Sequence, residues 1–217
     1  MRLYLDTADR AAAEPLLATG LFAGVTTNPA ILQRAAQRVA DIPDIHRWAT
    51  AGGAREVFFQ AWGEDTATLV KRGRELRDLG DEVVVKLVAS RAGCAACAEL
   101  AASGVPTLLT AVYNPGQAVV AAAAGATYIA PYLGKLQDAG LDGFDEIIAM
   151  QQVLAATGSS TKVLLASVRN VAGIVRLARH GVDCHTMAPA VADEFFADEL
   201  TALAVRTFED AVAATSA

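Results

Sequence analysis

The chain has 217 residues, of which 53% are hydrophobic, and it carries a formal net charge of −6. This length and composition are typical of one large globular domain and exclude an intrinsically disordered chain. The negative charge and the lack of any basic run argue against a nucleic-acid surface, so no nucleic-acid partner is expected.

The sequence offers no targeting or membrane signal. Residues 1–10 contain Asp6 and Asp9 and no apolar core, so we expect no signal peptide, and no apolar run is long enough for a membrane span. The odd number of cysteines, 3, suggests reduced thiols and a cytoplasmic location. Cys94 and Cys97 form a lone C-x-x-C in an alanine-rich helix, where small core-facing residues are the expected explanation.

No metal or cofactor is expected. The histidines, His46, His180 and His185, have no spacing typical of a zinc site. No predicted strand is followed by a glycine-rich dinucleotide loop or a phosphate-binding loop.

Predicted strands alternate with predicted helices along the whole chain. The strands cover residues 3–6, 24–28, 57–62, 83–88, 105–112, 127–133, 162–167 and 184–188, and the helices cover 8–19, 29–37, 44–51, 65–79, 92–103, 115–124, 143–156, 170–180 and 190–213. This alternation gives a parallel sheet with right-handed crossovers. Eight units of roughly 27 residues predict a (β/α)8 TIM barrel, with residues 1–217 as one domain and an extended C-terminal helical segment. A doubly wound open sheet is the alternative.

Residues 83–88, Val-Val-Val-Lys-Leu-Val, read as a strand that is covered on both faces, yet they contain Lys86. A buried ammonium loses its hydration, and the ordinary consequence is a depressed pKa. A neutral amine in a dry pocket is a nucleophile for ketones and forms a Schiff base. The alternative is a lysine near a strand end that reaches water or pairs with an acid.

Barrel enzymes carry their chemistry at the C-terminal ends of the strands. The polar residues in or just after the apolar runs are Asp6, Thr26, Asn28, Gln60, Lys86, Thr110, Tyr132 and Ser167. The alternation of side chains along a strand allows each to face the mouth, and it groups Ser167 with Leu165.

Each of these positions also has a structural interpretation. Asp6 or Asp9 could cap the next helix, and Asn28 before Pro29 could be a turn residue. Tyr132 could be a half-buried aromatic residue, and a threonine such as that at position 110 is common in strands. Gln60 is harder to explain structurally, because a buried amide needs partners.

The order of several motifs resembles the transaldolase and fructose-6-phosphate aldolase family of class I aldolases over essentially the whole chain. The motifs are Leu3-Tyr4-Leu5-Asp6-Thr7, Gly24-Val25-Thr26-Thr27-Asn28-Pro29, Val84-Val85-Lys86, Thr110-Ala111-Val112-Tyr113, Ala130-Pro131-Tyr132 and Ala166-Ser167. The resemblance implies the same barrel, with Lys86 as the Schiff-base lysine on the fourth strand. Transaldolases of the family carry glutamate and phenylalanine where this chain has Gln60 and Tyr132, so the chain resembles the fructose-6-phosphate aldolases.

Some residues depart from the family pattern. Val88 and Ser90 replace a proline and a threonine after the lysine, and Lys135 replaces an arginine. Arg169 matches the arginine of a Ser-Phe-Arg-Asn stretch. The resemblance implies that an acceptor phosphate lies between Lys135 and Arg169, with the Ser167 hydroxyl.

We therefore expect a class I aldolase that forms or cleaves ketoses such as fructose 6-phosphate, from dihydroxyacetone and glyceraldehyde 3-phosphate. The expected catalytic residues are Lys86, Tyr132, Gln60, Asp6 and Thr110, and the expected substrate-binding residues are Thr26, Asn28, Lys135, Ser167 and Arg169. A transaldolase is the first alternative, and a silent sugar-phosphate-binding barrel, motivated by Val88 and Lys135, is the second. The resemblance also implies a homo-oligomer, a pentamer or decamer, packed through residues 190–213, although a capping role within one chain is equally compatible.

Overall fold

The centre of the computed structural model, which describes residues 1–216, is a closed barrel of eight parallel strands in chain order. The strands are β1 (Arg2–Asp6), β2 (Phe22–Thr26), β3 (Glu56–Gln60), β4 (Val83–Val88), β5 (Thr107–Val112), β6 (Tyr128–Pro131), β7 (Lys162–Val168) and β8 (Cys184–Met187). The barrel closes because β1 pairs with β8 as well as with β2. The predicted (β/α)8 architecture is confirmed, and all strands end at one mouth.

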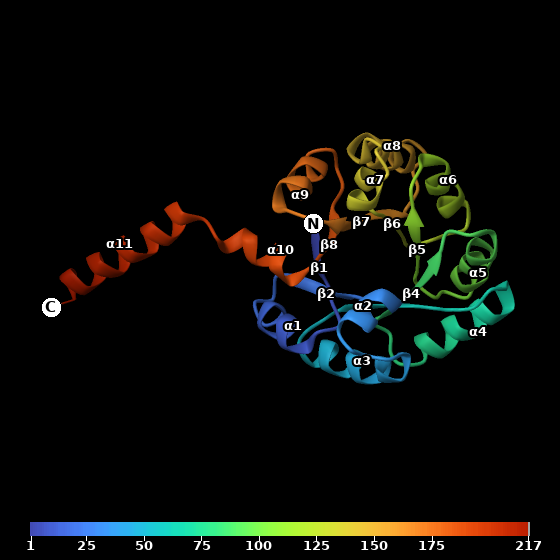
Figure 1. Ribbon diagram of the computed structural model, residues 1–217, viewed down its shortest axis with the longest axis horizontal. Coiled ribbons are helices and arrows are strands. Elements are labelled where there is room, and N and C mark those ends of the chain that lie inside the picture. The colour runs from blue at the N-terminus through green and yellow to red at the C-terminus, as the bar shows by residue number, and fades with distance from the viewer. Residues whose placement is uncertain (217) are drawn as a thin grey trace.

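Helices form a ring around the strands (Figure 1). The helices of the chain are α1 (Arg10–Leu17), α2 (Pro29–Arg34), η1 (Val39–Asp41), α3 (Ile42–Ala51), α4 (Thr66–Arg77), α5 (Arg91–Ala102), α6 (Pro115–Ala123), α7 (Leu133–Asp138), α8 (Gly143–Ala156), α9 (Val171–Ala178), α10 (Pro189–Asp193), η2 (Glu194–Phe196) and α11 (Glu199–Thr215), of which α11 lies outside the ring. Cys94 and Cys97 on α5 pack against the core as predicted, and both are free thiols.

The helices after β6 and after β8 differ from the prediction. The strand expected to continue to residue 133 ends at Pro131, and α7 follows it directly. The single helix expected over residues 190–213 is divided into α10, η2 and α11. It divides because the Asp198 carboxylate accepts a hydrogen bond from Thr201 N at 2.7 Å and so begins a new helix.

The strand residues belong to two separate cores because side chains alternate between the faces of the barrel wall. On β4, Val85 and Leu87 pack outward against the helices, whereas Val84 packs inward with residues of the other strands. Lys86 follows Val84 on the inner face and lines the cavity at the mouth. The inward direction of the lysine therefore follows from the outward packing of its apolar neighbours.

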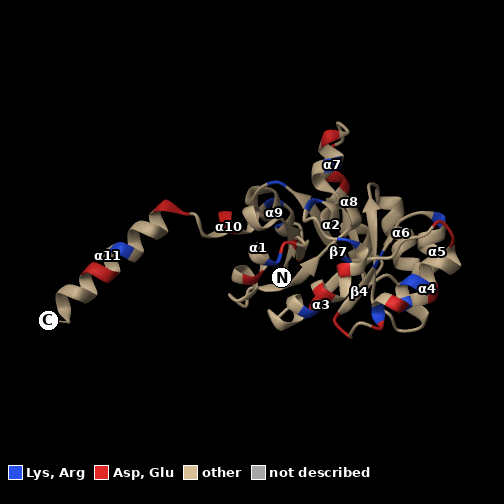
Figure 2. Cartoon of the chain, turned by 60° about the horizontal axis from the view of Figure 1, so that its bottom comes forward, with Lys and Arg blue, Asp and Glu red and all other residues tan. Residues whose placement is uncertain are grey.

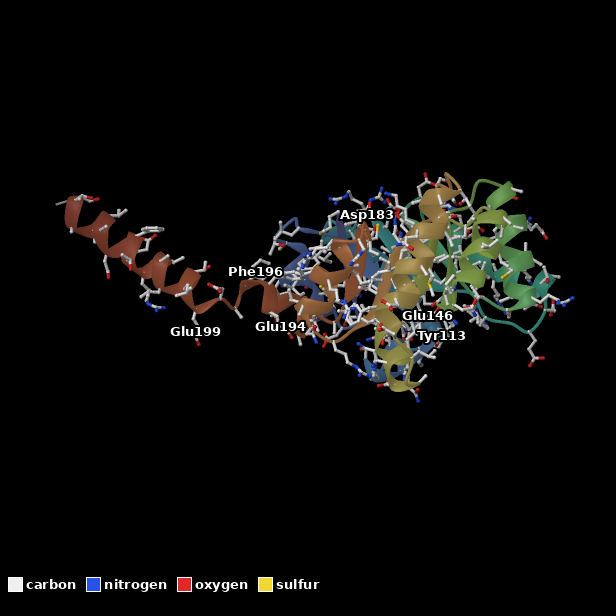
Figure 3. The ribbon with its side chains drawn as sticks, turned by 90° about the horizontal axis from the view of Figure 1, so that it is seen from above. Tyr113, Glu146, Asp183, Glu194, Phe196 and Glu199 are labelled. Carbon is white, nitrogen blue, oxygen red and sulfur yellow. The ribbon has the colours of Figure 1, made fainter. Side chains whose placement is uncertain are left out.

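The opposite end of the barrel is closed by aromatic rings. Tyr4, Phe58 and Tyr128 pack edge to face, with ring centroids 5.3 Å and 5.5 Å apart. Both tyrosine hydroxyls donate hydrogen bonds to the Glu56 carboxylate. Figure 3 shows Asp183, at this closed end, and Tyr113, after β5, on opposite sides of the barrel. Solvent and ligands therefore reach the interior from the strand C-termini.

The helix α11 extends away from the barrel and buries no residue in the single chain (Figure 1). Its charged residues, Glu199, Arg206, Glu209 and Asp210, fall on one side of the helix by their spacing. Most of the ribbon of α11 belongs to uncharged residues (Figure 2). The exposed apolar residues include Leu200, Leu203, Phe208 and Val212. Among the described residues, no helix is long and apolar enough to cross a membrane.

His185 generates a prediction about acid stability. It is fully buried on β8, neither ring nitrogen has a hydrogen-bond partner among residues 1–216, and burial lowers its pKa to about 4. Between pH 6.5 and about 4 this histidine is protonated in the unfolded chain and neutral in the folded chain. As the pH falls from 6.5 to about 4, the free energy of unfolding should therefore decrease, by on the order of 3 kcal/mol from this one residue.

The measurement is urea unfolding of wild type and His185→Leu between pH 4 and pH 7. The substitution should flatten this part of the pH dependence. His180→Leu, at an exposed histidine, should leave it unchanged. Equal slopes for wild type and His185→Leu would contradict the assignment.

Candidate active site

A cavity of about 690 Å³ opens at the C-terminal ends of the strands. All ten site residues predicted from the sequence line it, namely Asp6, Thr26, Asn28, Gln60, Lys86, Thr110, Tyr132, Lys135, Ser167 and Arg169. They come from seven strands, the turns that follow them and, for Lys135, helix α7, so only closure of the barrel brings them together. The lining places these residues at one site, and their chemical roles stay predictions.

Lys86 lies in the wall of this cavity with 4% of its surface exposed. Its Nζ donates a hydrogen bond to the backbone carbonyl of Thr27 at 2.6 Å, and no carboxylate lies within ion-pair distance among the described residues. Burial lowers the pKa of the amine, and the charge of Asp6 opposes this effect. The surroundings therefore shift the equilibrium of the amine toward its neutral, nucleophilic form.

Asp6 ends β1 and faces the cavity, while the capping role falls to Asp9. The Asp9 carboxylate accepts hydrogen bonds from Ala11 N and Ala12 N at the start of α1. Burial raises the pKa of Asp6, and the positive charge of Lys86 and a hydrogen bond from Thr26 lower it. A carboxyl group with a raised pKa next to an amine with a lowered pKa is suited to exchange protons with it.

Tyr132 follows β6 and forms a hydrogen bond of 2.7 Å with the Thr110 hydroxyl on β5. Burial raises the pKa of the phenol, and the bond to Thr110 lowers it by a smaller amount. The ring packs edge to face on Tyr113, with centroids 6.0 Å apart. Tyr132 is therefore a protonated phenol in a fixed position, able to donate or accept a proton.

Asn28 and Gln60 supply two side-chain amides. The Asn28 side chain accepts a hydrogen bond from Ile31 N at 2.9 Å and so caps α2, although the residue also lines the cavity. Gln60 lies beside Lys86 in the register of β3 and β4, and its side chain has no hydrogen-bond partner within residues 1–216. Trp62 lies in a neighbouring apolar pocket with the Arg72 guanidinium over its ring, so it does not line the main cavity.

Ser167 reaches the cavity by a route that alternation did not predict. The expected grouping of Ser167 with an inward Leu165 is wrong, because Leu165 packs outward and Leu164 and Ala166 face inward. The pairing of β7 with β8 is irregular between Leu165 and Val168, and Ser167 has φ 57°. This left-handed backbone, unusual for a residue other than glycine, turns Ser167 toward the mouth.

The cations of the site lie on two sides of the mouth. Lys135 on α7 and Arg169 after β7 share one side, where Arg169 Nη2 forms an ion pair of 2.6 Å with Asp138. Gly134 permits this packing, because a Cβ there would lie 2.9 Å from Ser167 Oγ and 3.0 Å from Arg169 Nε. Arg34 at the end of α2 lies on the other side. Asp6 is the one carboxylate among the described lining residues, so the mouth is cationic in a chain of net charge −6.

Sequence analysis missed two polar or charged residues of the described lining, Arg34 and Thr186. Thr186 is the last polar residue of β8, and the rule that selected the other strand-end residues could have found it. Arg34 is the last residue of a short helix, and its direction depends on how α2 packs over the barrel. No local sequence signal marks that direction.

Comparisons with known proteins agree with this geometry. Residues 3–217 match the family model described as "Transaldolase/Fructose-6-phosphate aldolase". The chain is 36% identical over 210 residues to a protein of Phenylobacterium zucineum named "Probable transaldolase", covering 96% of this chain and 94% of that one. It is 32% identical over 209 residues to a protein of Nitrosopumilus maritimus with the same name, covering 96% and 93%.

A solved structure of a mandelate oxidase mutant superposes with a TM-score of 0.58 at 17% identity. The match covers 86% of this chain and 63% of the oxidase. At this identity the likeness concerns the barrel fold alone.

Proposed function

The chain belongs to the transaldolase/fructose-6-phosphate aldolase family, and from this premise we propose that it is a Schiff-base aldolase acting on ketose phosphates. The proposal depends on one observation above all, the amine of Lys86, buried to 4% exposure and bonded to a backbone carbonyl instead of a carboxylate. Its substrates are a dihydroxyacetone-type donor and an aldehyde such as glyceraldehyde 3-phosphate.

In the first step the neutral Lys86 amine adds to the ketone carbon of the donor, and the carbonyl oxygen takes up a proton to give a carbinolamine. Loss of water then forms the iminium. Asp6 is the proton donor and acceptor for these transfers, because its charge acts on the pKa of the Lys86 amine. Asn28 orients the donor hydroxyls.

In the second step the iminium accepts the electron pair of the C3–C4 bond. The bond breaks, the C4 hydroxyl passes its proton to the water beside Tyr132, and the products are an aldehyde and an enamine on Lys86. Tyr132, with a water held by Gln60 and Thr110, returns a proton to the enamine carbon. Hydrolysis of the resulting iminium frees the lysine, and bond formation is the reverse sequence.

The acceptor phosphate binds on the side of Lys135, Ser167 and Arg169. Lysine attracts the phosphate as a point charge, whereas arginine can hold two of its oxygens. Arg169 is already paired with Asp138, so phosphate competes with that carboxylate for the guanidinium. Lys135 therefore supplies the charge that is not engaged in an ion pair among the described residues.

Transaldolase activity is the second candidate, and the names of the relatives favour it. In that reaction the enamine attacks a second sugar-phosphate aldehyde instead of taking a proton. The pair Gln60 and Tyr132 favours the aldolase by resemblance, and Tyr132 offers the phenolic proton that ends the cycle without an acceptor.

Borohydride trapping tests the proposal. Reduction in the presence of dihydroxyacetone should attach the donor to Lys86, as read by peptide mass analysis, and Lys86→Met should lose the label and at least about 10³-fold in kcat/KM. Lys135→Met, which removes the other cavity lysine, should still trap the donor. A label on any residue other than Lys86, or none, would refute the mechanism.

Gln60→Glu tests the choice between the two activities. With fructose 6-phosphate as donor, the ratio of transfer to erythrose 4-phosphate over free dihydroxyacetone release should rise by about tenfold, a difference of ~1.4 kcal/mol between the two barriers. Gln33→Glu, an exposed change of the same charge on α2, should leave the ratio unchanged. An unchanged ratio for Gln60→Glu would remove the subfamily argument.

We further propose that α11 packs on another copy of the chain. Leu200, Leu203, Phe208 and Val212 are each more than half exposed in the single chain, which is unusual for a helix with an apolar face. A pentamer or a pair of pentamers follows from the family resemblance.

Light scattering tests the assembly. Wild type should have several times the 22.5 kDa mass of one chain, and Phe208→Glu combined with Leu203→Glu should lower it. Arg206→Glu, on the charged side of α11, should keep the wild-type mass. A monomeric wild type would refute the assembly and leave the aldolase proposal intact.

A further inference from the structure

A chain of hydrogen bonds lies on the inner wall of the barrel beside the proposed nucleophile. Thr26 Oγ1 donates to Asp6 Oδ1 at 2.6 Å, and it lies 2.6 Å from Thr186 Oγ1. A hydroxyl has a single hydrogen, so while Thr26 donates to Asp6 its oxygen accepts from Thr186. The chain therefore runs from Thr186 through Thr26 to the carboxylate.

The fold holds this chain in place. Asp6 ends β1, and the two threonines come from the strands on either side of it, β2 and β8. Thr26 lies opposite Asp6 in the β1–β2 register, and Thr186 lies opposite Tyr4 in the β1–β8 register. Thr26 and Thr186 are 1% and 3% exposed, so water does not compete for their hydroxyls.

We propose that Thr186 is a positioning residue which, through Thr26, fixes the orientation and proton affinity of the Asp6 carboxyl for proton transfer at Lys86. The inference rests on the proposed function, because that function is what assigns Asp6 a proton transfer at Lys86. Oδ1 of Asp6 is committed to Thr26, whereas Oδ2 has no hydrogen-bond partner among the described residues. Proton exchange with the reacting atoms is thereby directed to Oδ2.

The electrostatics of Asp6 indicate the direction of the effect. The charged groups that act on it are Lys86 from β4 and Arg34 from α2, and the charge of Asp6 in turn raises the pKa of the Tyr132 phenol after β6. Burial raises the pKa of Asp6, and the bond from Thr26 lowers it. A hydroxyl that accepts a hydrogen bond is a stronger donor, so loss of the Thr186 hydroxyl weakens the bond to Asp6. The pKa of Asp6 should then rise.

Thr186→Val tests this inference, because valine keeps the shape of the side chain and removes the hydroxyl. The rate of borohydride-trappable imine formation with dihydroxyacetone is measured as a function of pH. The limb of this pH–rate profile that Asp6→Asn abolishes is assigned to the titration of Asp6. Thr186→Val should move this limb to higher pH by about 0.5 to 1 unit, and Thr26→Val should move it further.

Two variants serve as controls. Thr186→Ser, which keeps a hydroxyl, should retain the wild-type limb. Thr107→Val, at a fully buried threonine on β5 whose hydroxyl contacts Cys97, removes a hydroxyl outside the chain and should also retain it. A limb that Thr186→Val leaves in place, or that Thr107→Val moves equally, would overturn the proposal.

Direct titration of Asp6 separates this inference from the proposed function. The carboxyl carbon shift of labelled aspartate, assigned with Asp6→Asn and followed without substrate, should report the same upward shift in Thr186→Val even if wild type forms no imine. Thr186→Ala replaces the valine variant if the latter does not fold. Failure of both to fold, with normal folding of Thr107→Val, would assign Thr186 a purely structural role and also overturn the proposal.

Discussion

The burial of one amine inside a barrel wall is the constraint on which the rest of the site depends. A buried lysine either loses its proton or pairs with a carboxylate. In this structure the Nζ of Lys86 donates a hydrogen bond to a backbone carbonyl and is almost fully shielded from solvent. Desolvation of an ammonium disfavours the charged form, so the environment itself lowers the pKa of the proposed nucleophile. The other residues of the cavity then need only to supply protons and orient a substrate.

The two groups proposed to transfer protons are also held by neighbouring strands. Asp6 is bound through Thr26 to Thr186, and Tyr132 is bound to Thr110, so each ionisable group has a hydroxyl partner from an adjacent strand. Such partners fix a side chain without bringing a second charge close to it. The result is a set of groups whose protonation is set mainly by burial, which suits an enzyme that moves protons at neutral pH.

The charge of the mouth contrasts with that of the whole chain. Lys135, Arg169 and Arg34 surround a cavity that holds a single carboxylate, although the chain is acidic overall. A local excess of cations attracts an anionic substrate, while the negative net charge of the chain disfavours non-specific binding of polyanions to the rest of the surface. The exposed apolar residues of α11 are the other departure from an ordinary surface, and this helix extends away from the barrel (Figure 1).

The sequence by itself determined the barrel, the strand that carries Lys86 and eight polar strand-end residues of the cavity, because alternating elements and strand-end positions are local patterns that closure converts into one mouth. Lys135 and Arg169 were predicted from the family resemblance, and they line the same cavity. Sequence analysis did not find the backbone turn at Ser167, the break of the C-terminal helix, or the two lining residues Arg34 and Thr186. Only the tertiary structure decided the turn at Ser167 and the direction of Arg34, because both depend on contacts between segments far apart in the chain. The Asp198 cap that begins a new helix and the strand-end position of Thr186 are local features that the sequence contains and that its analysis overlooked. Lys86 belongs to both categories. Its place on β4 is evident from the local sequence, whereas the burial of its amine requires the closed barrel of all eight strands.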